Sequence, residues 1–156
     1  MAALGACGCA GGHHVNLLMK RFFDITFRPF FVLTGLGTAT AGLYAFWPQW
    51  AIAHIAKFAY SQEYTIVLQH WGIMVCLMGV FMVVAAYRAD GRVPILIYSG
   101  LEKSFMVYLV VANLSHPYSQ GFLIGAVMDA AVVLYTIGYF AVCGFKVPSS
   151  TGALSS

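Results

Sequence analysis

Adjacent Glu102 and Lys103 interrupt an apolar stretch, residues 95–114, that has the length of a membrane-spanning helix. Asp129 interrupts the next such stretch, residues 121–143. Charged side chains inside a bilayer are costly, so they face the interior of a helix bundle, pair with one another, or mark a functional site. These three residues are therefore the principal candidates for chemistry in this chain.

The depths of the charged residues favour a shared position in the bilayer. At about 1.5 Å of rise per residue, Lys103 lies roughly 13 Å from one membrane face and Asp129 roughly 15 Å from the other. An ion pair between them is geometrically reasonable, and Glu102 is close enough to join it. Three interpretations stay open: a polar pocket for a headgroup, quinone, substrate or protons; a structural pair that fixes helix register; and snorkelling of Lys103 to the nearer interface.

His70 and Asn113 are further candidates for a ligand site. A neutral imidazole at His70 could ligate haem or donate a hydrogen bond to a quinone carbonyl. The spans offer no second histidine, which disfavours a bis-histidine haem, and a lone histidine at the membrane interface is the alternative interpretation. Asn113 continues the helical stripe that contains Glu102.

Cys7 and Cys9, followed by His13 and His14, have the ligand types that suit Zn²⁺ or Cu(I). Their spacing matches no closed zinc pattern, so we expect a flexible tail and no metal site. The chain also lacks the zinc-protease, nucleophile-elbow and phosphate-loop patterns, which favours a role other than catalysis.

The composition sets the environment in which these residues must work. Of the 156 residues, 61% are hydrophobic and 8% are charged, with a mean hydropathy of +0.82. A soluble domain carries about 25% charged residues. The chain is therefore expected to be an integral membrane protein. Its formal charge of +3 is too small and too dispersed to indicate a nucleic-acid partner.

Hydropathy and turn residues predict an all-α, four-span bundle within residues 19–148. The predicted spans are residues 29–47, 64–87, 95–114 and 121–143. Residues 49–63 alternate polar and apolar positions, which indicates a short amphipathic helix in the headgroup region between the first two spans. Residues 1–18 are expected to form a disordered tail and residues 149–156 a loose C-terminus.

The basic residues predict the orientation of the bundle. Only Lys57 falls on one side of the four-span arrangement. The other side holds Lys20, Arg21, Arg28, Arg88, Arg92 and Lys146. The positive-inside rule then places both termini in the cytoplasm, and we expect a bacterial inner membrane.

Small residues indicate where helices would approach closely, because lipid provides little hydrophobic incentive for their association. Three of the four predicted spans carry a face of small residues. The faces are Thr34, Thr38, Ala41 and Gly42 in the first, Gly72, Cys76 and Gly79 in the second, and Gly121 and Gly125, continued by Asp129, in the fourth.

The layout over residues 20–145 resembles the small four-helix membrane proteins grouped as DoxX-like. The resemblance rests on chain size, four spans, the short basic turn at residues 88–92 and the polar run at residues 101–104. The Phe-rich segment at residues 22–31 is not assigned to that pattern. The resemblance implies a link to quinone or sulfur redox metabolism in some relatives.

The leading functional hypothesis is a non-catalytic accessory or anchor subunit of a larger membrane assembly. The alternatives are a quinone- or lipid-binding redox component and a small proton-coupled carrier, each using Glu102, Lys103 and Asp129. The expected partners are membrane lipids and either other membrane subunits or further copies of the chain. The sequence identifies no cofactor: quinone or bound lipid is compatible with the charged residues, and haem is disfavoured.

Overall fold

The computed structural model describes the backbone of residues 10–144 and the side chains of residues 17–144. Within that part of the chain, four helical segments are long and apolar enough to cross a membrane. They are Leu17–Phe46, Gln62–Tyr87, Arg92–Ala112 and Pro117–Cys143. The predicted all-α, four-span fold is therefore confirmed.

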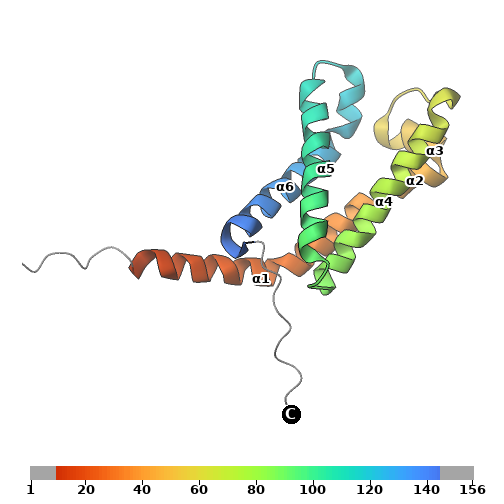
Figure 1. Ribbon diagram of the computed structural model, residues 1–156. Helices are drawn as coiled ribbons and strands as arrows, with labels where there is room; N and C mark the ends of the chain where they lie inside the picture. The colour runs from red at the N-terminus through yellow and green to blue at the C-terminus, as the bar shows by residue number, and fades with distance from the viewer. Residues whose placement is uncertain (1–9, 145–156) are drawn as a thin grey trace, which may run out of the picture.

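The helices form two antiparallel pairs, as Figure 1 shows. One pair joins α1 (Ala10–Ala39) and α2 (Gly42–Phe46) to α4 (Thr65–Tyr87), and the other joins α5 (Arg92–Ala112) to α6 (Leu123–Cys143). The turn at residues 88–91 links the pairs at one end of the bundle, which we name the turn end. The opposite end, the loop end, carries four short elements: α3 (Pro48–Ala51), η1 (Ile52–Ala56), η2 (Gln62–Tyr64) and η3 (Pro117–Phe122).

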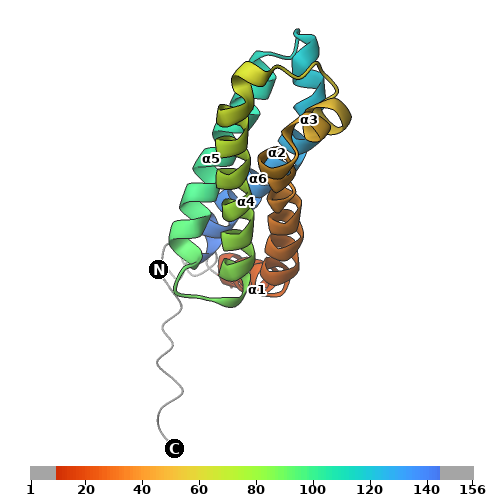
Figure 2. The same cartoon turned by 90° about the vertical axis from the view of Figure 1, so that its right-hand side faces the viewer.

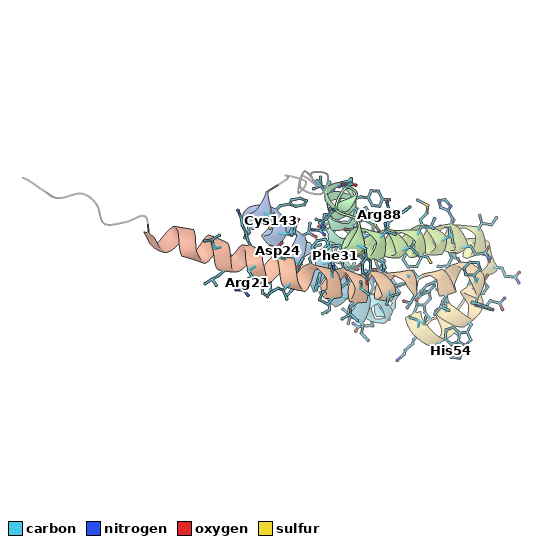
Figure 3. All side chains as sticks on the ribbon, turned by 90° about the horizontal axis from the view of Figure 1, so that it is seen from below. Arg21, Asp24, Phe31, His54, Arg88 and Cys143 are labelled. Carbon is cyan, nitrogen blue, oxygen red and sulfur yellow. The ribbon has the colours of Figure 1, made fainter. Side chains whose placement is uncertain are left out.

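The first helix begins well before the predicted first span. Residues 10–18 are helical, so the prediction of a disordered tail is wrong for them, and residues 1–9 and 149–156 lie outside the described residues. Helix α1 bends partway along its length (Figure 1), and it contains Pro29, which removes one backbone hydrogen bond and crowds the preceding turn. Figure 3 shows Arg21 and Asp24 on the first half of α1, well away from the loop end.

Glycines bring the first helix pair into close contact, as the small-residue faces predicted. A Cβ on Gly79 would lie 2.4 Å from the backbone nitrogen of Ala39 and 2.5 Å from the carbonyl oxygen of Gly35. A Cβ on Gly72 would lie 2.9 Å from the carbonyl oxygen of Ala41. Only residues without a side chain allow this approach, so these glycines determine how α1 and α2 pack on α4.

An aromatic core joins the two helix pairs near the turn end. Phe23, Phe27 and Phe31 are spaced one turn apart on α1, so they share one face, and all three are buried. They pack against Tyr135 and Tyr139 of α6. The Phe-rich segment left unassigned from the sequence therefore forms the main contact between α1 and α6.

The loop end brings the two pairs together a second time. The predicted amphipathic helix is present as α3 and η1, with Ala51, Ile52 and Ala56 buried, and it ends earlier than expected, at Lys57, whose φ of 60° reverses the chain. A Cβ on Gly121 would lie 2.1 Å from the carbonyl oxygen of Ala56, so η1 packs directly on η3 (Figure 2). The pairs thus meet at both ends, with side chains of every span lining the space between.

Candidate functional site

An ion pair joins α5 to α6. Lys103 Nζ donates a hydrogen bond to Asp129 Oδ1 across 2.6 Å. The exposed fraction is 2% for Lys103 and 7% for Asp129. Snorkelling of Lys103 to the interface is therefore the wrong interpretation, because its ammonium group is buried against a carboxylate.

Glu102 borders the pair without completing it. Its Oε2 atom lies 3.7 Å from Lys103 Nζ, close enough for charge attraction and too far for a hydrogen bond. That oxygen is buried, and it has no hydrogen-bond partner within the described part of the chain. Three formal charges therefore meet in one place and leave a carboxylate oxygen without a donor.

The facing wall is formed where α1 gives way to α2. Thr40 and Ala41 leave the regular helix, and their backbone nitrogens donate instead to Gly37 and Thr38 in tighter turns. Irregular backbone at membrane depth is tolerated where it lines a cavity or is buried against other protein segments, because its polar groups are then kept away from lipid. Thr38 is 4% exposed, and its Oγ1 has no partner among the side chains and backbone that the structure describes.

A cavity of about 360 Å³ separates these walls. Its polar lining includes the three charged residues together with Thr38 and Thr40. Its apolar and aromatic lining includes Tyr44, Ile55, Trp71, Val75, Met106, Phe122, Ile124, Gly125 and Met128. The cavity therefore combines a small polar region with a larger apolar one, which is typical of sites for small molecules.

A second cavity of about 340 Å³ lies between α4 and α5. It shares Trp71, Val75, Glu102 and Met106 with the first, so these side chains form a partition between the two. Phe105 on its wall is 61% exposed and Ile124 on the wall of the first cavity is 88% exposed. Both cavities thus reach the lateral surface of the bundle.

His70 and Asn113 lie away from this site. His70 is exposed on α4, because Gly72 faces α2 and a residue two positions away points to nearly the opposite side of the helix. Asn113 donates from Nδ2 to the carbonyl oxygen of Leu109 at 2.8 Å and accepts from the Tyr118 hydroxyl at 3.0 Å. Its amide closes the end of α5, and it does not line either cavity.

Several lining residues were not predicted as parts of a site. Thr38 was identified only as part of a packing face, and Tyr44 and Trp71 were not identified as site residues. The contact between Tyr44 and Trp71, with ring centroids 5.3 Å apart, joins the first span to the second. Cys7 and Cys9 lie outside the described residues, as do the side chains of His13 and His14.

Comparison of the chain with protein-family models, curated proteins and solved structures finds no match. The resemblance to DoxX-like proteins therefore stays a prediction. The class that the fold defines is a small integral membrane protein with four spans.

Proposed function

We propose that this membrane protein binds a lipophilic molecule with a polar head in the cavity between its two helix pairs. The observation that carries the proposal is the placement of Glu102 and of the Lys103–Asp129 pair on the wall of a cavity that is otherwise mostly apolar. Charged groups in hydrocarbon call for a compensating partner. A bound polar head with an apolar tail would complement both parts of the lining.

Entry from the bilayer fits the position of the cavities. Their exposed rims, at Ile124 on one side and Phe105 on the other, would face acyl chains. Met106 on the shared partition and Met128 in the first cavity have flexible side chains that adapt to irregular ligands. Quinones and lipids have this combination of tail and head, so the quinone- or lipid-binding hypothesis is the one we favour.

A cavity-filling substitution tests the proposal. Gly125 lines the cavity, and a Cβ built there meets nothing within 4 Å among the described residues, so Gly125→Leu should add bulk to the cavity from an open position. Mild-detergent extracts of the wild type should retain a defined lipophilic molecule, identified by mass spectrometry, that Gly125→Leu loses. Ala131→Leu, which places the same side chain on an exposed position of α6, should retain it. Equal amounts in all three proteins, or none in the wild type, would contradict the proposal.

The accessory-subunit hypothesis is the second candidate, and one observation favours it. Tyr98, Phe105 and Tyr108 lie along one side of α5 and are 53%, 61% and 63% exposed. Tyrosines on a span fit a protein surface that satisfies their hydroxyl groups better than acyl chains would. A partner subunit should then co-purify in fixed ratio and be lost from Tyr98→Ala/Tyr108→Ala but not from Val127→Ala.

Both termini are proposed to face the cytoplasm of a bacterial inner membrane. The turn end carries Arg88 and Arg92 and lies on the side of the first half of α1, with Arg21 and Arg28, whereas Lys57 lies at the loop end. By the positive-inside rule, the end with more Lys and Arg residues faces the cytoplasm. The carrier hypothesis uses the same carboxylates and stays a prediction.

A further inference from the structure

We infer that the head group taken by this cavity is an ammonium ion that carries N–H donors, held between Glu102 and Thr38. The inference rests on the proposed ligand-binding function and names the chemical class of the ligand. It goes beyond the expectation of a quinone or a phospholipid, since it requires a positive charge and donors on the head.

One of the two carboxylates at the site has no hydrogen-bonded cation among the described residues. Lys103 and Asp129 satisfy each other at 2.6 Å, whereas Glu102 Oε2 is 3.7 Å from the ammonium nitrogen. With one cation and two carboxylates, the formal charge of the cluster is −1. A monocation at Glu102 would balance it and supply the hydrogen bond that this buried oxygen lacks within the described structure.

A second acceptor for the same head lies on the facing wall. Thr34, one turn earlier on α1, donates its hydroxyl hydrogen to the carbonyl oxygen of Phe30 at 2.7 Å. Thr38 makes no such bond to any described residue, although it is nine-tenths buried and lines the cavity. Buried polar groups are ordinarily hydrogen-bonded, so this free hydroxyl points to a missing partner.

The remaining lining favours a cation over an anion. Tyr44 and Trp71 present aromatic rings to the cavity, and ring faces attract ammonium groups. The cation on the cavity wall, Lys103, is already engaged by Asp129, and an anionic head would face the unbalanced carboxylate of Glu102. The structure therefore assigns the cavity to an amphiphilic amine with its tail along Met106 and Met128.

Four probes with the same dodecyl tail separate the contributions of charge and donors. They are dodecylammonium, dodecyltrimethylammonium without N–H groups, neutral dodecanol and anionic dodecyl sulfate. The full-length chain in nanodiscs carries Trp47→Phe and Trp50→Phe, which leaves Trp71 on the cavity wall as the sole indole. Dodecylammonium should change its fluorescence saturably, and the other three should bind at least about tenfold more weakly, since hydrogen bonds to charged groups are among the strong ones.

Paired variants locate the head. Glu102→Gln should weaken dodecylammonium binding at least about tenfold, whereas Glu63→Gln, an exposed carboxylate at the loop end, should leave it unchanged. Thr38→Val should weaken binding about threefold or more, and Thr38→Ser, which keeps the hydroxyl, should restore it. Unchanged binding in Glu102→Gln would overturn the inference.

The failure of the inference and that of the proposed function give different results. If dodecanol binds as tightly as dodecylammonium and Gly125→Leu abolishes both, the cavity binds ligands and the ammonium inference is wrong. If none of the four probes binds saturably and no lipophilic molecule co-purifies, both are wrong. Circular dichroism of each variant distinguishes lost binding from lost folding.

Discussion

Lys103 on α5 and Asp129 on α6 form a hydrogen-bonded ion pair with a 2.6 Å separation, and each side chain is at least nine-tenths buried. Removing one partner of such a pair leaves an uncompensated charge, whereas replacing both with apolar groups is often neutral. The pair therefore makes a double-substitution test informative.

Lys103→Met alone should lower the free energy of unfolding by about 3–5 kcal/mol, because Asp129 then lacks its cation. Lys103→Met combined with Asp129→Leu should recover most of that loss. Unfolding in mild detergent measures both, with Lys57→Met at the exposed loop end as the control. A single Lys103→Met protein as stable as the wild type would show that the pair contributes nothing.

Gly79→Ala should disrupt the first helix pair. The new methyl group would lie 2.4 Å from the backbone nitrogen of Ala39, and backbone cannot move aside as a side chain can. We expect a loss of at least about 2 kcal/mol in unfolding free energy, in the range of overpacked cores. Gly125→Ala makes the matched control, and equal melting temperatures for the two variants would contradict the packing argument.

Arg92→Lys should weaken the contact between the turn end and the aromatic core. The Arg92 guanidinium carbon lies 4.1 Å from the centroid of the Phe27 ring, and Phe27 is 1% exposed. Lysine keeps the positive charge and loses the flat stacking group, so unfolding free energy should fall by about 0.5–2 kcal/mol. Arg88→Lys, an exposed neighbour, should change it little; a larger effect at Arg88 would refute the assignment.

The orientation can be read with single cysteines that leave every basic residue in place. Asp90→Cys lies in the turn end and Ser115→Cys at the loop end, and both positions are exposed. In a background without the four native cysteines, a membrane-impermeant maleimide should label Ser115→Cys in intact spheroplasts and Asp90→Cys only after lysis. The reverse pattern would invert the proposed topology.

The sequence predicted those features that depend on periodicity and on the cost of charge in lipid. The four spans follow from apolar length, and the proximity of Lys103 and Asp129 follows from equal depth on helices joined by a short loop. The contact faces of Gly72 and Gly79 follow from residue size. Each of these inferences needs only one helix or one helix pair.

The features that the sequence missed depend on how separate pairs dock. The cavity exists because Phe27 and Phe31 hold the pairs together at one end and Ala56 meets Gly121 at the other. The phenylalanines look like an ordinary apolar stretch, and the small size of Gly121 indicates a close approach without identifying Ala56 as the partner. The sequence also gives no sign that the Thr38 hydroxyl lacks a partner, since Thr34 and Thr38 share one face and only Thr34 bonds back to its own helix in the described structure.

The short turn at residues 88–91 divides the chain into two hairpins, and both members of the buried ion pair belong to the second. During biosynthesis, the later hairpin can therefore neutralise Lys103 with Asp129 as it enters the lipid, without waiting for the earlier one. Within that hairpin, Glu102 shares only the ammonium group of Lys103 among the described residues, so the walls around it are complete only when the two halves of the newly made protein close on each other.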